Sequence, residues 1–233
     1  MMNLFYAPNI DSVTQLPEDE SLHITRVLRL KKEDSITITD GKGFFYSATI
    51  TDIRAGHCQV SVTKRWSQKT PRNYMVHIAV APTKNADRME WFVEKATEIG
   101  IDTITCLRCR HSERNGIKLQ RLYKTAISAI KQSQQAFLPQ INEMTEFHEF
   151  ISSHRKGYKM IAHYPDGCKQ LIKDIYTPDS DALIMIGPEG GFSPDELNAA
   201  LAAGFVPVSL GDSRLRTETA ALAACHTIHL LNQ

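Results

Sequence analysis

The feature that most restricts the fold is a regular alternation of short apolar runs and longer helical patterns from residue 75 onward. Runs with strand character and segments with helical spacing follow one another along this whole stretch. Strands joined by helices form largely parallel sheets with helices on both faces, so the sequence predicts an α/β domain here. The strand-like runs are residues 75–80, 103–107, 159–162, 182–186 and 205–210, and the helical segments are residues 88–98, 119–135, 194–203 and 218–231.

The first part of the chain has a different pattern. Short β-rich runs alternate with turn signals, and Asp40-Gly41 between the first two runs is typical of a hairpin. This pattern predicts a small antiparallel barrel or sheet. A polar stretch that contains Pro71 ends it, so we expect one domain over residues 1–70 and a second over residues 73–233. The β-rich runs are residues 36–39, 44–50 and 57–62.

Composition excludes several classes of protein. The formal net charge of the 233 residues is +1, so no global excess of Lys and Arg demands a nucleic acid partner. No apolar segment approaches the roughly 18 residues that span a bilayer, and the N-terminal residues lack a secretory signal pattern. The 5 cysteines are odd in number and scattered, unlike a disulfide framework. We expect a cytoplasmic protein with reduced thiols and no membrane association.

A glycine-rich segment, IGPEGGFSPDE at residues 186–196, directly follows a strand-like run. Ser193, Pro194 and Glu196 have the pattern of a capping box, so the segment is predicted to join a strand to a helix. In open α/β sheets ligands bind beyond the carboxyl ends of strands, where this loop would lie. One glycine suffices for a tight turn, and three within five residues favour close approach of a ligand. The three are Gly187, Gly190 and Gly191.

The same loop restricts the ligand. The chain has neither of the common phosphate-binding glycine motifs, and Glu189 would repel a phosphate. A carboxylate among backbone amides suits a ligand with hydroxyl donors, a positive charge or an adenine edge. S-adenosylmethionine combines these three features, and a nucleoside would also fit.

A second loop, GDSRLRTETA at residues 211–220, lies between the last predicted strand and an alanine-rich helix. Thr217 is the expected N-cap, and Glu218 complements the positive end of the helix. Arg214 and Arg216 either contact a ligand or bond a neighbouring carbonyl or carboxylate group. We favour a functional role for Arg216.

Basic residues gather near the N-terminus. Arg26 and Arg29 are three apart, which predicts that both lie on one face of a short helix, and Lys31 and Lys32 follow. Such a run is either a solvated helical face or a contact for an RNA backbone.

The segments IGPEGGFSPDE and LRTETAA, the latter at residues 215–221, resemble the RsmE family of 16S ribosomal RNA (uracil N3) methyltransferases in the SPOUT superfamily. The resemblance implies an N-terminal PUA-like small β-barrel for RNA and a C-terminal SPOUT α/β domain with a mostly parallel sheet and a trefoil knot. It also implies S-adenosylmethionine as cofactor, 16S ribosomal RNA or the small ribosomal subunit as partner, and a homodimer, for which a small-residue face at Ala220, Ala221, Ala223 and Ala224 is suitable. The resemblance extends through His23 with Val27-Leu-Arg29, Lys84 with Asp87-Arg88, KATEIGI at residues 95–101, and Gln132-Ser133 before Pro139.

Site residues follow from the same resemblance, and no metal is among the implied ligands. The implied cofactor contacts are Ala162, His163, Gly187, Pro188, Glu189, Gly190, Gly191, Leu210, Gly211, Leu215 and Arg216. The implied RNA contacts are Arg26, Arg29, Lys31, Lys32, Lys84 and Arg88.

The implied reaction needs help at the nucleophile, because N3 of uracil is weakly nucleophilic while it carries its proton. A guanidinium stabilises charge on O2 and O4 without changing its own protonation, so Arg216 is assigned to charge stabilisation or base positioning. The predicted catalytic residues are Arg216 and Glu218. The general base stays open among Glu218, Glu189 and His163.

Two positions depart from the family pattern. Similar proteins usually carry an arginine where this chain has Gln135, and many have one where it has Ser213, with Arg214 one place later. The role of Arg214 is therefore open.

The sequence also bears on functions from other classes. Cys106, Cys109 and His111 suggest zinc, but residues three apart on a strand face opposite sides, and no second cysteine pair follows. The chain has no Gly-x-Ser-x-Gly motif, which disfavours a serine hydrolase. Two alternatives stay open: a non-catalytic RNA-binding factor for ribosome assembly, and a SPOUT methyltransferase that acts on tRNA.

Overall fold

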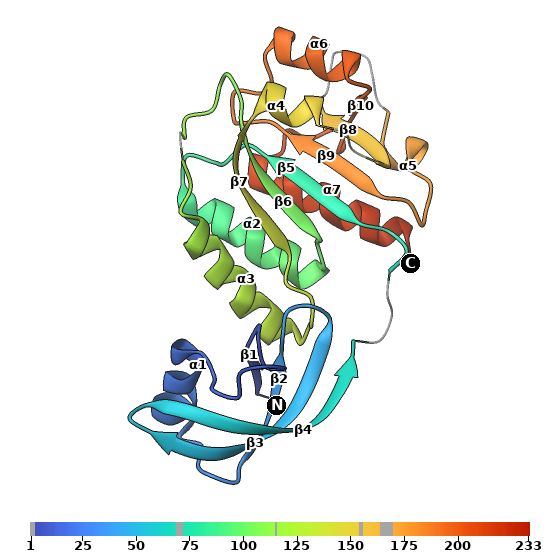
Figure 1. The fold of residues 1–233 in the computed structure, drawn as a ribbon. Coiled ribbons are helices and arrows are strands. Elements are labelled where there is room, and N and C mark those ends of the chain that lie inside the picture. Colours follow the sequence, from blue (N-terminus) through green and yellow to red (C-terminus); the bar gives the residue numbers. More distant parts are fainter. Residues whose placement is uncertain (1–2, 69–71, 115, 154–155, 164–169) are drawn as a thin grey trace. The chain divides into compact units, whose positions relative to one another are not determined.

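The structure, a computed structural model, describes residues 3–68, 72–114, 116–153, 156–163 and 170–233. The chain forms two compact units (Figure 1). The first comprises Met1–Pro71 together with Ile127–Leu138, and the second comprises Arg72–Ala126 and Pro139–Gln233. The expected boundaries at residues 70 and 73 did not include the return of residues 127–138 to the first unit.

The first unit contains a four-stranded sheet in the order β1-β2-β3-β4. β2 with β3 and β3 with β4 pair antiparallel, as the sequence predicts, whereas β1 pairs parallel with β2 and was not expected. Asp40 shapes the predicted hairpin turn, because its Oδ1 accepts hydrogen bonds from the N–H groups of Lys42 (2.7 Å) and Phe44 (3.1 Å). The strands are Leu4–Tyr6 (β1), Ser35–Thr39 (β2), Phe44–Arg54 (β3) and His57–Ser67 (β4).

A short helical segment lies between β1 and β2 in the chain. It consists of α1 (Glu18–Leu22) and a π-helical stretch, η1 (His23–Leu28). Arg29 follows as the C-cap with a left-handed φ of 55°, so it lies outside the helix. The prediction that Arg26 and Arg29 share one helical face is therefore wrong, because the chain turns away after Leu28.

The second unit contains a six-stranded sheet in the order β10-β8-β9-β5-β6-β7. Every adjacent pair is parallel, which confirms the predicted sheet type. The centre of the sheet is apolar because it is covered on both faces, and all five residues of β9 are buried. The strands are Val76–Val80 (β5), Thr103–Arg108 (β6), Gln140–Glu146 (β7), Tyr158–Ala162 (β8), Ala182–Ile186 (β9) and Val206–Val208 (β10).

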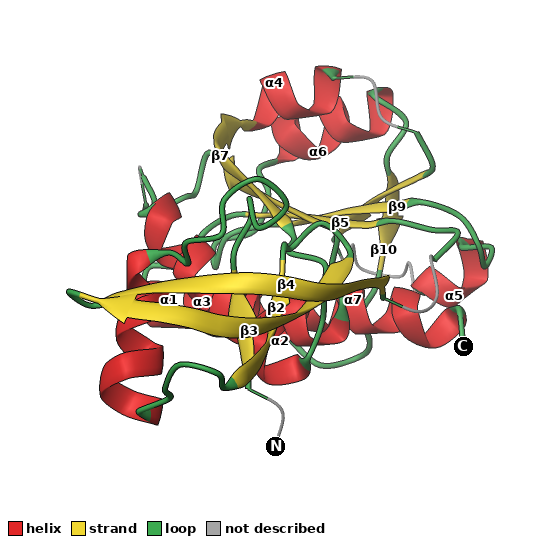
Figure 2. Ribbon diagram, turned by 60° about the horizontal axis from the view of Figure 1, so that its bottom comes forward, coloured by secondary structure: helices red, strands yellow, loops and turns green. Residues whose placement is uncertain are grey.

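Helices cover both faces of this sheet, as predicted (Figure 2). α2 (Ala86–Ile99) and α7 (Thr217–Leu231) pack against each other on one face. α4 (Phe147–Ser152) and α6 (Pro194–Ala202) lie on the other face, over a core that includes Leu107, Met185 and Phe192. The remaining helices are α3 (Leu119–Ser133) and α5 (Ile172–Ile175).

The helix ends that border the glycine-rich loops have clear local causes. Ser193 caps α6 in a capping box with Glu196, whose Oε2 accepts the Ser193 N–H at 2.8 Å, as predicted. α7 begins at Thr217 with Arg216 as its N-cap, so the assignment of Thr217 as the N-cap is wrong by one residue. The Thr217 hydroxyl donates to the carbonyl oxygen of Gly187 instead, at 3.1 Å.

The small residues of α7 pack within their own unit. Ala221 and Ala224 have no exposed surface, and Ala220 and Ala223 are half-buried. Of the four residues, only Ala220 and Ala223 therefore keep surface that a second copy could contact, and the homodimer stays a prediction. The trefoil knot also stays a prediction. In the part of the chain that the structure describes, no helix is both long enough and apolar enough to cross a membrane.

Candidate functional site

The glycine-rich loop leaves the carboxyl end of β9 and makes a tight turn. Gly191 adopts a left-handed φ of 72° and donates its N–H to the carbonyl oxygen of Pro188 at 2.8 Å. A Cβ atom on Gly190 would lie 3.0 Å from Cβ of His111, and one on Gly187 would lie 3.1 Å from the Phe192 ring. All three glycines are needed for the turn or for packing against protein atoms. The argument for a ligand therefore depends on the hollow beside the loop.

That hollow has a volume of about 570 Å³, within the range of about 300–1,000 Å³ that is typical of small-molecule sites. It lies at the carboxyl ends of β8 and β9, between the glycine-rich loop and the segment that leads into α7. Nine of the predicted cofactor contacts line it: Ala162, His163, Gly187, Pro188, Glu189, Gly190, Gly191, Leu215 and Arg216. The other lining residues are Arg88, Ile186, Phe192, Arg214, Thr217 and Ala220.

Two predicted cofactor residues do not line this hollow. Leu210 and Gly211 precede it in the chain, where the Gly211 N–H donates to the Ser209 hydroxyl at 3.2 Å and Gly211 has a φ of 121°. Their role as cofactor contacts stays a prediction. Thr217 and Ala220 line the hollow but were not predicted as contacts. Both belong to the TETA sequence at residues 217–220, which carries part of the family resemblance and could have indicated them.

Neighbouring loops hold the glycine-rich loop in place. Glu189 Oε1 accepts the Lys84 N–H at 3.2 Å, and Arg114 Nε donates to the Lys84 carbonyl oxygen at 3.0 Å. The His111 ring Nδ1 lies 3.1 Å from the Gly191 carbonyl oxygen. The backbone of the loop before α2 and two side chains of the loop after β6 thus fix the shape of this wall of the hollow.

The two arginines before α7 differ in their contacts. Arg214 Nη2 lies 3.5 Å from the Glu189 carbonyl oxygen. Of the two roles expected for these arginines, ligand contact or a bond to a neighbouring group, Arg214 thus has the second. Arg216 is exposed, and its guanidinium has no hydrogen bond or ion pair among the described residues. Arg216 is therefore the guanidinium that is available to a ligand.

Glu218 is the buried charge of the region. Its side chain is 8% exposed, and Oε1 lies 3.7 Å from Arg88 Nε. The second oxygen, Oε2, is buried without a hydrogen-bond partner in the described structure. A buried polar atom without a partner costs free energy, roughly 1–3 kcal/mol, so its retention suggests a functional use.

A second hollow, of about 350 Å³, adjoins Glu218. Arg88 and Arg216 line both this hollow and the larger one. Trp91 was not predicted as a site residue, although it follows Arg88 by three positions and therefore shares its helical face, which was the available signal. The hollow is lined by Asp87, Arg88, Trp91, Arg216, Glu218 and Thr219.

Protonation in the larger hollow is governed by burial. Burial lowers the pKa of His163 below its ordinary value, so its imidazole is neutral at neutral pH. Outside the hollow, a hydrogen bond to Glu113 raises the pKa of Lys84, whose ammonium is 2.9 Å from that carboxylate. Of the predicted RNA contacts in this unit, Lys84 and Arg88 are thus both paired with carboxylates.

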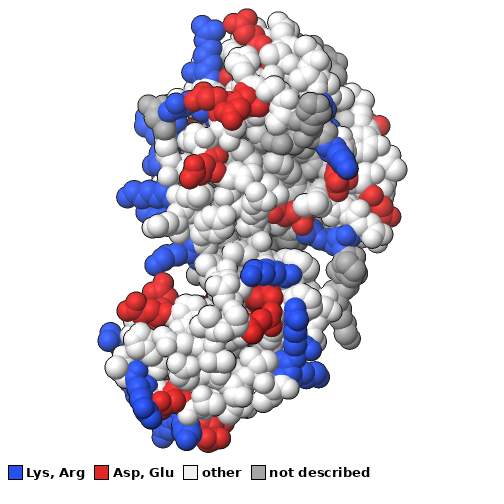
Figure 3. All heavy atoms as spheres, in the orientation of Figure 1, with Lys and Arg blue, Asp and Glu red and all other residues white. Residues whose placement is uncertain are grey.

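The other predicted RNA contacts belong to the first unit. Arg26, Arg29, Lys31 and Lys32 are all exposed. On the face of the molecule shown in Figure 3, basic side chains are interspersed with acidic ones, in agreement with the net charge of +1. The role of these four residues in RNA binding stays a prediction.

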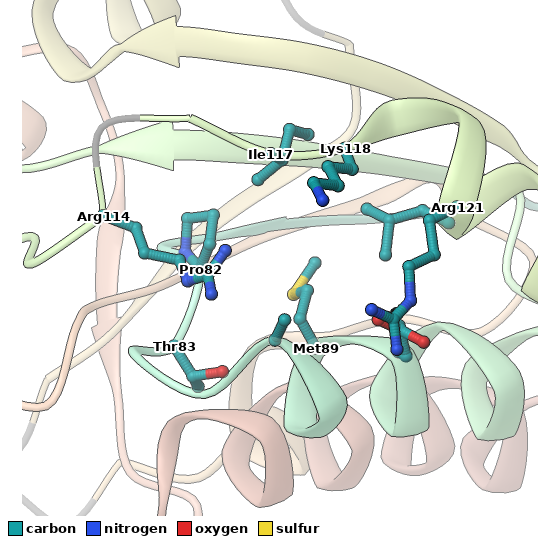
Figure 4. A pocket seen from close by; sticks show the side chains of 10 residues that line it. Pro82, Thr83, Met89, Arg114, Ile117, Lys118 and Arg121 are labelled. Atoms are coloured by element: carbon teal, nitrogen blue, oxygen red, sulfur yellow. Dashed lines mark ion pairs between the residues drawn. The ribbon is translucent and has the colours of Figure 1, made fainter.

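A third hollow, of about 180 Å³, lies between the start of α2 and the chain before α3 (Figure 4). Met89 and Leu122 supply apolar surface, and Arg114, Lys118 and Arg121 place cationic groups around it. Arg121 is engaged with acidic residues, since its Nε lies 2.6 Å from Glu90 Oε1. The structure assigns no role to this hollow.

The residues considered for zinc do not form a metal site. β6 ends at Arg108, so Cys109 lies beyond the strand and the argument from alternating strand faces applies to Cys106 only. Both thiols are buried, and burial raises the pKa of Cys106 to about 12. Among the described residues, no group of three or more His, Cys, Asp or Glu side chains is arranged to hold a metal ion.

Comparison with known proteins identifies the family. Residues 70–229 match the RNA methyltransferase domain family, and residues 16–63 match the RNA methyltransferase PUA domain family. The ribosomal RNA small subunit methyltransferase E of Buchnera aphidicola subsp. Acyrthosiphon pisum is 32% identical over 214 residues, which cover 88% of this chain and 83% of that protein. The chain belongs to the ribosomal RNA small subunit methyltransferase E family.

Solved structures share the fold of this methyltransferase. A probable rRNA-methyltransferase from Porphyromonas gingivalis is 45% identical with a TM-score of 0.93, and the match covers 99% of this chain and 98% of that one. A ribosomal RNA small subunit methyltransferase E from Neisseria gonorrhoeae, bound to S-adenosyl methionine, is 29% identical with a TM-score of 0.88, and covers 100% and 98%. The two-part architecture is therefore that of the methyltransferase E family, with a PUA-like first part and an RNA methyltransferase domain.

Proposed function

We propose that this protein transfers a methyl group from S-adenosylmethionine to N3 of a specific uridine in 16S ribosomal RNA. The observation that carries the proposal is the 570 Å³ hollow at the ends of β8 and β9, bounded by the two recognised loops. The family, and the S-adenosyl methionine bound to the Neisseria gonorrhoeae relative, support the choice of cofactor and of RNA.

The lining of the hollow suits this cofactor chemically. Glu189 can accept hydrogen bonds from ribose hydroxyls, and backbone groups of the two loops can pair with an adenine edge. His163 is neutral, so it does not oppose the positive sulfonium. When bound, S-adenosylmethionine supplies an activated methyl group. The residues proposed to hold it are those that line the hollow, together with the predicted contacts Leu210 and Gly211.

Two side chains at the start of α7 are assigned to catalysis. Arg216, whose guanidinium has no partner among the residues that the structure describes, stabilises the negative charge that develops on O2 and O4 of uracil as N3 loses its proton. Glu218 is our choice as the acceptor of that proton, because its Oε2 is buried and has no hydrogen-bond partner in the described part of the chain. The other two candidates are less suitable, since Glu189 already accepts the Lys84 N–H and His163 lies in the cofactor hollow.

The remaining expectations complete the proposal. The exposed residues Arg26, Arg29, Lys31 and Lys32 contact RNA phosphates, and Lys84 and Arg88 do so from the second unit. The target uridine is unpaired, because an A-form duplex hides the edge that carries N3. We also propose residues 1–70 as the RNA-binding domain, residues 73–233 as the methyltransferase domain, a homodimer, and a cytoplasmic location that follows from a ribosomal substrate.

Calorimetry with S-adenosylmethionine, followed by methyl transfer to small-subunit ribosomal RNA that lacks the modification, tests the function. We expect Arg216→Ala to lower methyl transfer by about 100- to 1,000-fold, the cost of removing one donor to a developing oxyanion. Cofactor affinity should be largely retained, since the Arg216 side chain is assigned to the base and the other lining residues still hold the cofactor. Mass spectrometry of the digested RNA identifies the methylated atom and position.

Arg110→Ala is the matched control, because Arg110 is an exposed arginine of the same unit that pairs with Asp195. It should transfer methyl groups at the wild-type rate. Unchanged transfer by Arg216→Ala would reject the role of that residue. Absence of cofactor binding by the wild-type protein would instead indicate a non-catalytic assembly factor, and methyl groups found in the tRNA fraction would indicate a tRNA substrate.

A further inference from the structure

Trp91 is a large aromatic residue whose side chain is unusually exposed. It lies on α2, is 41% exposed, and its indole has no ring contact or hydrogen bond within the part of the chain that the structure describes. The indole is one wall of the 350 Å³ hollow beside Glu218. An exposed aromatic face in a concave site is the kind of surface on which RNA-binding proteins stack unpaired bases.

The hollow adjoins the cofactor site. Arg88 and Arg216 line both hollows, so a ligand in the smaller one lies beside a ligand in the larger one. A methyl acceptor must occupy such a position, because transfer requires the two reacting groups to be in contact. The smaller hollow is therefore placed for the substrate and not for a second cofactor.

The polar groups of the hollow indicate which part of an RNA fits. The charged side chains of the hollow balance, because Asp87 and Glu218 oppose Arg88 and Arg216, so no net positive charge favours a phosphate there. Glu218 Oε2 needs a hydrogen-bond donor, and Arg216 offers donors to carbonyl oxygens. A flat ring with one N–H between two carbonyl groups satisfies both of these side chains, and the N3 edge of uracil has this arrangement. Cytosine has an acceptor at N3, which would face the carboxylate.

We propose that this hollow holds the target uracil, with the Trp91 indole as its stacking face. The proposal rests on the proposed function, because it names the site that holds the target base of the RNA substrate. Trp91 acts as a positioning residue that orients the ring, so that its imide edge is directed to Glu218 and Arg216.

Binding measured without cofactor tests this role, with the anisotropy of a dye on the RNA as the readout for every variant and Trp91 fluorescence as a second readout where that residue is present. The chain has 2 tryptophans, so a Trp66→Phe background leaves Trp91 as the only indole fluorophore. The probes are short single-stranded RNAs with one central uridine, dihydrouridine or 3-methyluridine in a cytidine sequence. Dihydrouridine keeps the imide edge but lacks the aromatic ring, and 3-methyluridine keeps the ring but lacks the N–H.

We expect the uridine probe to change Trp91 fluorescence and to bind about 5- to 100-fold more tightly than the dihydrouridine probe, as base stacking on an aromatic side chain predicts. Trp91→Ala should remove this preference and keep the preference for uridine over 3-methyluridine. Trp91→Phe should retain most of both. Leu201→Ala, which changes a side chain of similar exposure (43%) on α6, should alter neither preference.

Three outcomes would overturn the proposal. The first is a wild-type protein that binds uridine and dihydrouridine probes equally, and the second is a Trp91→Ala variant that keeps the uridine preference. The third is a Trp91→Ala variant whose only change is a lower molecular mass in sedimentation, which would make Trp91 a contact between two copies. Failure of the proposed function is a separate result, seen as absent S-adenosylmethionine binding and absent methyl transfer by the wild-type protein.

Discussion

At the scale of single residues, Gly191 shows how backbone conformation shapes the cofactor wall. Its φ of 72° lies in the left-handed region, and a Cβ atom there would meet no atom within 4 Å. A substitution is therefore opposed by backbone strain and not by collision. We expect Gly191→Ala to lower the free energy of unfolding by about 1–2 kcal/mol, and Gly191→Asn to cost less, because asparagine tolerates this region. Urea unfolding measures both; a greater loss for the larger asparagine would contradict the explanation.

The sequence motifs predicted most of the residues that line the larger hollow. Both loops follow strands of the same parallel sheet, β9 and β10, which are separated only by β8, and the residues of each loop are close together in the sequence. The motifs did not predict which polar atoms would be left without partners. Arg214 and Arg216 look alike in sequence, yet only Arg214 reaches the Glu189 carbonyl oxygen. The exposure of Trp91 was equally hidden, since it depends on what packs over α2 and not on the sequence of α2 itself.

At the scale of elements, the C-terminal end of α7 is held by a neutral histidine. His229 is buried, its Nδ1 lies 2.9 Å from the Tyr74 hydroxyl, and Arg72 Nη1 is 3.3 Å from the same atom. Burial, and then the positive charge of Arg72, lower the pKa of His229 to about 4. Between that pH and the ordinary value of 6.5, the unfolded chain takes up a proton at His229 and the folded chain does not.

The free energy of unfolding should therefore fall as the pH decreases from about 6.5 to about 4, by roughly 3 kcal/mol in total, at about 1.4 kcal/mol per pH unit. Denaturant titrations across this range measure the dependence. Comparison with His229→Gln isolates the contribution of this group from that of the carboxylates. His148→Gln, a change at an exposed histidine of the same unit that does not act on His229, is the control and should keep the wild-type dependence. An unchanged pH profile in His229→Gln would contradict the assignment.

Long elements with a clear period were predictable, and short or polar ones were not. α2 runs from a capped start at Asn85 to Gly100, whose φ of 106° ends it where the sequence predicts. β7 was missed because it is an edge strand whose residues are mostly polar, with only Ile141 buried, so it lacks an apolar run. α4 was missed because six residues are too few for a helical period, although Phe147 and Phe150 are both buried.

At the scale of the whole molecule, the membership of residues 127–138 in the first unit was not predictable. The sequence predicted α3 as one helix, and it is one helix, but its second half belongs to the core of the other unit. Ala136 packs with Leu4, Phe45 and Trp66, and its carbonyl oxygen accepts the Gly43 N–H at 2.9 Å. An amphipathic pattern shows which face of a helix is buried, but it does not show against which partner.

The ion pair between Lys131 and Glu20 tests this long-range connection. Lys131 Nζ lies 2.8 Å from both carboxylate oxygens of Glu20, whose side chain is 7% exposed. Lys131→Met leaves a buried carboxylate without its partner and should cost about 3–5 kcal/mol of stability in the first unit, whereas the double variant Glu20→Leu with Lys131→Met should recover most of it.

In a Trp91→Phe background, Trp66 fluorescence follows the unfolding of this unit alone, because Trp66 packs against Ala136. Equal losses in the single and double variants would show that the pair is not coupled, and an unchanged Trp66 transition in Lys131→Met would show that residues 127–138 do not stabilise the first unit. The expected result would mean that the first unit draws part of its stability from a segment more than a hundred residues from its N-terminal helix.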